Sequence, residues 1–184
     1  MAEANWRAPA LTPEEKTARL VIERFGVRPP VDVRRIAAEY ATIKELAFPV
    51  SCDAVTIRKL GEGDRPRILL NTNSTKFEPR KRFTLSHEIG HIKIPWHCGS
   101  IACHVDEGNA SVSGEHYSYE GEAHRFTSEL LMPTDWVRQV IEDERTIERI
   151  VNEAEVSRTG WCPGLIANPA FGPHKSQHPW GLNP

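Results

Sequence analysis

Two segments near the start of the chain space their apolar residues as helices do. In residues 12–26 the residues expected on the buried face follow the i, i+3, i+4, i+7 pattern: Ala18, Val21, Ile22 and Phe25. Thr12 and Glu15 form the capping-box pattern, and Gly26 provides a helix stop. A second short helix is predicted to begin at Asp32, with four residues facing inward: Val33, Ile36, Ala37 and Tyr40.

Between residues 43 and 70 the apolar pattern changes from helical to extended. Segments 54–57 and 67–70 are rich in β-branched or apolar residues and flank the turn-forming run 61–64. This arrangement predicts a β-hairpin, and a third strand is predicted near 43–48.

The second half of the chain returns to helical spacing. A helix is predicted from Glu78 to the break at Ile94-Pro95, and others over about 120–131, from a cap at Thr134, and over 147–154. Residues 97–119 have no clear period and are predicted to form a long loop. Helices, a small sheet and then more helices predict an α+β fold.

Three regions follow from this order of elements. Residues 1–11 form a polar N-terminal lead, residues 12–157 a single domain, and residues 158–184 a tail rich in Gly and Pro. A tail of that composition, without an apolar period, is expected to be irregular.

Composition narrows the classes of function. The 184 residues carry a formal net charge of −2, which argues against direct nucleic-acid binding. No apolar run is long enough to cross a bilayer, and the N-terminus lacks the pattern of a secretory signal. The expected location is therefore the cytoplasm, without a membrane partner.

The most specific chemical pattern in the chain is His87-Glu88-Ile89-Gly90-His91. Two histidines four residues apart lie on one face of a helix, so both imidazoles can reach one metal ion. The glutamate between them can take a proton from a bound water instead of ligating the ion. The pattern predicts a catalytic metal site in which Glu88 is the general base.

A catalytic zinc usually takes three protein ligands, and two residues compete for the third position. The favoured one is Glu122, on the downstream helix, where small Ala123 would let two helices approach closely; Glu120 and His124 are nearby substitutes. The alternative is His97, at the position of the third histidine in metzincins. Those enzymes need a glycine where this chain has Ile94, and an isoleucine resists positive φ.

With these residues in place, the chain resembles the ImmA/IrrE family of metallo-endopeptidases. The resemblance rests on RFTLSHEIGH at 82–91 and EAHRFTSELLMP at 122–133, with weaker similarity at 29–33 and 68–71. Two motifs in the right order are more specific than either alone. Ser86 and Thr127 depart from the family pattern, since alanine is usual at both positions.

The resemblance implies a zincin-like metalloprotease fold with gluzincin-like site geometry. It assigns His87, His91 and Glu122 as metal ligands and Glu88 as the base. Zinc is the expected ion, and manganese or iron would also suit such ligands. Several relatives cleave a helix-turn-helix repressor encoded beside them, which induces stress-response or mobile-element genes. The resemblance therefore implies a protein substrate of that kind.

In the expected reaction, Glu88 accepts the water proton and passes it to the leaving amine. A second stabiliser of the oxyanion is expected among four residues of the loop region: Tyr117, Tyr119, His116 and His104. The alternative from another class is a non-catalytic interaction module of a toxin–antitoxin-like regulatory pair. Glu88 argues against that alternative, because a structural metal helix needs no general base.

Overall fold

The computed structural model describes most of the chain between residues 10 and 157. The described residues are 10–48, 52–58, 63–73, 78–97, 100–104, 114–143 and 145–157; for 100–104 and 114–117 the description covers the backbone only. In this part of the chain the elements follow in this order: α1 (Pro13–Phe25), α2 (Val33–Tyr40), β1 (Thr42–Leu46), β2 (Cys52–Ile57), β3 (Arg67–Asn71), α3 (Glu78–Lys93), β4 (Ser100–His104), α4 (Gly114–Leu131), α5 (Thr134–Glu142) and α6 (Ile147–Ala154). The α+β prediction is confirmed.

The first two helices begin where their capping residues predict. The backbone amide of Thr12 donates to Glu15 Oε2 at 2.7 Å, and the Glu15 amide donates back to Thr12 Oγ1 at 3.4 Å. Gly26 ends α1 in the left-handed conformation at φ 59°, which glycine adopts without a steric penalty. Asp32 caps α2 by accepting from the amide of Arg35 at 3.0 Å.

Four strands form one sheet in the order β1-β3-β2-β4. β2 and β3 pair antiparallel, as the hairpin prediction required, and β1 joins the far side of β3 in parallel. β4 pairs antiparallel with the other edge of β2. The prediction of one loop over 97–119 is therefore wrong, because that stretch contains β4 and the first residues of α4.

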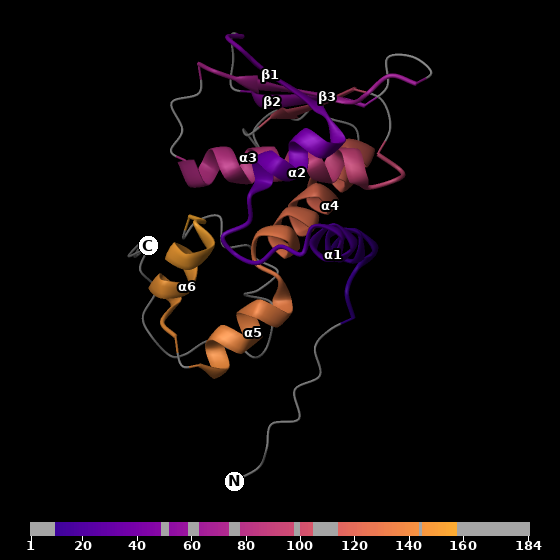
Figure 1. Cartoon of the computed structure of the whole chain (residues 1–184). Helices are drawn as coiled ribbons and strands as arrows, with labels where there is room; N and C mark the ends of the chain where they lie inside the picture. Colours follow the sequence, from indigo (N-terminus) through magenta and orange to yellow (C-terminus); the bar gives the residue numbers. More distant parts are fainter. Residues whose placement is uncertain are drawn as a thin grey trace, which may run out of the picture.

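The helices pack on one side of the sheet around α3. In Figure 1, α3 runs beneath the strands with α4 crossing on its other side, and contacts join α3 to β2, to α2 and to α4. α1 packs along α4. The largest fully buried side chain of the core is Phe126, on α4. Burying a phenylalanine contributes about 1.5–3 kcal/mol, so this contact helps to fix α4 against its neighbours.

The C-terminal helices begin differently from each other. Thr146 caps α6 by accepting from the amide of Arg149, whereas the N-cap of α5 is Pro133, which has no side-chain bond to offer. The predicted cap at Thr134 is thus wrong. Instead, the Thr134 amide and hydroxyl donate to the buried carboxylate of Glu129, the hydroxyl at 2.7 Å. Glu129 therefore joins the end of α4 to the start of α5.

None of the described helices combines the length and hydropathy needed to cross a membrane. The predicted irregular tail, 158–184, lies outside the described residues.

Candidate metal centre

Helix α3 presents two buried histidines on one face. His87 is 4% exposed and His91 is fully buried, and their Nε2 atoms lie 3.0 Å apart. The distance follows from the i, i+4 spacing, which stacks side chains one turn apart on the same face. The two nitrogens therefore point toward one common position.

Helix α4 adds a carboxylate to this pair. Glu120 Oε2 lies 3.0 Å from His87 Nε2, and Glu120 Oε1 lies 3.3 Å from His91 Nε2. Four tetrahedral ligands at about 2.0–2.1 Å from a zinc ion lie about 3.3 Å apart. The spacing of the three donor atoms fits that geometry, so His87, His91 and Glu120 form a candidate metal site.

Close contact between α3 and α4 makes this convergence possible. A Cβ at Gly90 would meet Phe126 Cδ1 at 3.1 Å and the Cα of Ala123 at 3.4 Å. A glycine on α3 therefore faces a small residue on α4, which allows the two backbones to approach. The expectation that Ala123 permits close helix packing is confirmed.

Burial and pairing set the charges of these side chains. Burial lowers the pKa of His87 from 6.5 to about 4, and the nearby His91 acts in the same direction. Burial acts to raise the pKa of Glu120, but hydrogen bonds and charge interactions with both histidines outweigh it and hold that pKa well below its ordinary value. His87 is thus neutral and Glu120 is ionised at neutral pH, the forms that bind a metal ion.

The general-base candidate lies on the same helix, one residue after His87. Glu88 is fully buried, and the hydroxyl of Thr56 on β2 donates to its Oε2 at 2.5 Å. A hydrogen bond from a fixed strand residue orients the carboxylate beside the metal-site histidines. Thr56 could not be predicted from the sequence, because nothing in the alternation of β2 indicates which α3 residue it meets.

Arg58, just after β2, secures the end of α3. Its Nη1 donates to the carbonyl of His91 in the last turn at 3.4 Å, and to the carbonyls of Ile94, at 2.6 Å, and His97 just after the helix. The last carbonyls of a helix lack partners within the helix, and a basic side chain can satisfy them. Thr56 on β2 and Arg58 just after it therefore contact both Glu88 and the end of the helix that carries the site.

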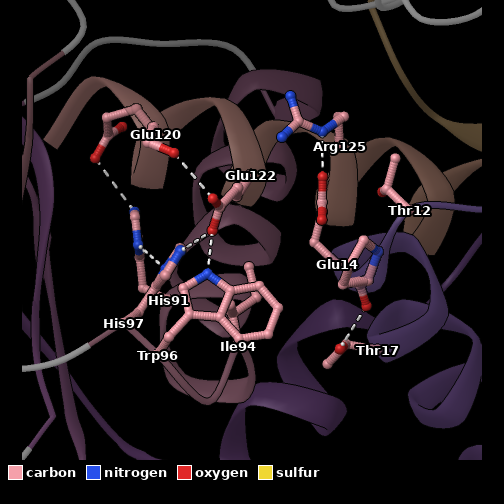
Figure 2. Close-up of polar contacts among 12 residues, drawn as sticks. Thr12, Glu14, Thr17, His91, Ile94, Trp96, His97, Glu120, Glu122 and Arg125 are labelled. Carbon is pink, nitrogen blue, oxygen red and sulfur yellow. Dashed lines mark hydrogen bonds and ion pairs between the residues drawn. The ribbon is translucent and has the colours of Figure 1, made fainter. Parts of the chain in front are cut away.

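His97 and Glu122, the two alternatives predicted for the third ligand, contact each other in the structure. His97 Nε2 and Glu122 Oε2 are 2.9 Å apart, and His97 Nδ1 lies 2.9 Å from His91 Nδ1 (Figure 2). His97 is fully buried. Glu122 also accepts hydrogen bonds from Trp96 Nε1 and, at 2.9 Å, from Ser118 Oγ. Glu120 therefore faces the Nε2 atoms of His87 and His91. Glu122 is linked to His91 through His97, on the Nδ1 side of the ring.

The other predicted residues lie around this centre. The His124 ring packs 4.8 Å from the His87 ring, centroid to centroid, and the Tyr119 ring lies 4.5 Å from that of His97. Of the remaining oxyanion candidates, Tyr117 and His116 lie on α4 and His104 on β4. The side chains of those three fall outside the described part of the structure.

Comparison with known proteins agrees with this geometry. The chain matches the IrrE N-terminal-like domain, Peptidase M78, over residues 28–159, which contain the candidate metal site and span well over half of the sequence. A search of curated proteins finds no match to it. The chain therefore belongs to the M78 family of IrrE-like peptidases and is a metallopeptidase with a His-His-Glu candidate metal site.

Proposed function

We propose that this metallopeptidase is a zinc-dependent endopeptidase in which His87, His91 and Glu120 hold the ion. The observation that carries the proposal is the convergence of two α3 nitrogens and one α4 carboxylate at mutual distances of 3.0–3.3 Å. Two imidazoles and one carboxylate are a common ligand set for catalytic zinc, and they leave a coordination position for water or substrate. Manganese or iron would also suit these ligands.

When bound, zinc would supply a Lewis acid that lowers the pKa of a coordinated water and polarises the scissile carbonyl. The chain's own contribution centres on Glu88. Its carboxylate accepts a proton from the attacking water and returns that proton to the amine as the peptide C–N bond breaks. Thr56 holds the carboxylate in orientation through Oε2. Burial of Glu88 keeps bulk water away from the proton transfer.

We further propose that the substrate is a helix-turn-helix repressor and that its cleavage induces stress-response or mobile-element genes. The support is the resemblance of 82–91 and 122–133 to ImmA/IrrE proteases, several of which act in this way.

The test is co-expression with a candidate repressor, chosen from the genes beside this one because it carries a helix-turn-helix domain. Glu88→Gln preserves the shape of the side chain but cannot accept the proton, so we expect it to retain metal and to lose cleavage. Glu142→Gln is the matched control, because Glu142 is an exposed carboxylate at the end of α5.

Each outcome of this experiment has one meaning. Cleavage by the wild type and by Glu142→Gln, but not by Glu88→Gln, supports the mechanism. Equal cleavage by Glu88→Gln contradicts the role of Glu88. If the wild type binds the repressor with zinc present but leaves it intact, the proposed substrate is wrong and a binding role in a regulatory pair is favoured instead.

A further inference from the structure

His97 contacts His91 on the side that faces away from the metal site. The two Nδ1 atoms are 2.9 Å apart, and both residues are fully buried. His91 Nε2 points toward His87 and Glu120. If that Nε2 keeps its lone pair for the metal, the His91 proton must reside on Nδ1, where it can only be donated to His97.

The same reasoning fixes the proton of His97. Because His97 Nδ1 accepts from His91, a neutral His97 carries its own proton on Nε2. That nitrogen lies 2.9 Å from Glu122 Oε2, and an ionised carboxylate is an acceptor only. Trp96 and Ser118 also donate to Glu122. Figure 2 shows the resulting chain from Glu120 through the two histidines to Glu122.

The surrounding residues hold this chain in one arrangement. Arg58 donates to the backbone carbonyl of His97, and the Tyr119 ring packs against the His97 ring at a 4.5 Å centroid distance. A fixed imidazole beside an anionic acceptor is what a histidine ligand needs to keep one tautomer.

We infer that His97 and Glu122 form a positioning relay that sets the tautomer and orientation of His91 and makes it a stronger metal ligand. This inference rests on the proposed function, since it takes His87, His91 and Glu120 as the ligands. The relay serves one histidine only: among the described residues, His87 Nδ1 is buried and has no hydrogen-bond partner. Outer-shell partners of this kind typically change metal affinity about 10–100-fold.

The test measures zinc affinity of the full chain by competition with a chromophoric chelator at neutral pH. We expect Glu122→Ala and His97→Phe to weaken zinc binding roughly 10–100-fold. His97→Gln, which again offers an acceptor to His91, should recover part of that loss. Glu142→Gln is the control, because it alters an exposed carboxylate on α5 outside the relay; its zinc affinity should match the wild type.

Glu120→Ala separates the relay from the ligand assignment beneath it. Loss of zinc in Glu120→Ala, with weakened binding in Glu122→Ala and partial rescue by His97→Gln, supports both. Wild-type affinity in Glu122→Ala and His97→Phe overturns the relay and leaves the proposed function standing. Zinc retained by Glu120→Ala but lost by Glu122→Ala makes Glu122 the ligand, which overturns the ligand assignment and the relay together.

Discussion

Burial sets the charge of His87, and its histidine neighbours set that of Glu120, before any ion is bound. His87 stays neutral because its ring is removed from water, and Glu120 stays ionised because two imidazoles face it. A metal ion therefore displaces few protons at neutral pH. The folded chain therefore holds His87 and Glu120 in the charge states that bind a cation.

The lowered pKa of His87 predicts how the stability of the metal-free protein depends on pH. Between pH 6.5 and about 4 the unfolded chain binds a proton at this position that the folded chain excludes. Stability must therefore fall as pH falls through this window, by about 2 kcal/mol between pH 7 and pH 5. Urea unfolding of metal-free protein at both pH values measures the effect.

His87→Asn is the comparison for that experiment, because it removes the titrating ring. The variant should lose less free energy of unfolding than the wild type over the same pH interval. Identical pH dependence in the two proteins would show that His87 is not held neutral by burial.

The pairing of the two histidines could be predicted from the sequence. Which carboxylate of α4 faces them depends on how that helix is rotated about its axis, and the sequence alone does not give this rotation. His87 and His91 are linked by spacing within one helix. On α4, Ala123 and Phe126 face α3, and Glu120 lies on the same stripe because it precedes Ala123 by three residues. Glu122 precedes Ala123 by one residue, about 100° around the helix, and so meets His97 instead.

At the scale of elements, the crossing of α3 and α4 sets the ligand distances. Gly90 sits at the crossing, where a Cβ would meet Phe126 Cδ1 at a tight 3.1 Å, whereas a Cβ at Gly121 on α4 would meet only the end of Arg125 at 3.6 Å. Alanine favours a helix over glycine by about 1 kcal/mol. The two glycines therefore offer a matched pair of substitutions.

We expect Gly121→Ala to raise the free energy of unfolding by up to about 1 kcal/mol, because it gains helix propensity at an open position. Gly90→Ala should not show this gain and should weaken zinc binding, because Phe126 and Ala123 must move and carry Glu120 with them. Chemical unfolding and chelator competition measure both effects. Equal stabilisation by the two substitutions, with zinc affinity unchanged, would contradict a tight crossing.

The strands with a pattern of their own, β1, β2 and β3, were predicted, whereas β4 was not. β2 and β3 follow each other in the chain and pair with each other, so their alternation and the turn-forming residues between them suffice. β4 has five residues and depends on backbone pairing with β2, more than forty positions earlier in the chain, as in Ala54 with Cys103. Short strands whose partner is remote carry no period of their own.

At the scale of the whole molecule, the site is assembled from both layers of the fold. β2 contributes the Thr56 contact to Glu88, α3 contributes Glu88 and the two histidines, and α4 contributes the Glu120 carboxylate of the candidate site. α1 lies before the matched family region but packs along α4, where Glu14 accepts from Arg125 and Arg19 pairs with Glu129 (Figure 2 shows the first pair). The N-terminal helix thus braces the helix that carries Glu120.

The most direct test of the central claim is an anomalous-difference map of crystals grown with zinc, recorded at the zinc absorption edge. We expect one strong peak about 2.0–2.2 Å from His87 Nε2, His91 Nε2 and a Glu120 carboxylate oxygen, with His97 and Glu122 outside the coordination shell. A peak bonded to Glu122 or His97, or no peak between α3 and α4, would contradict the claim.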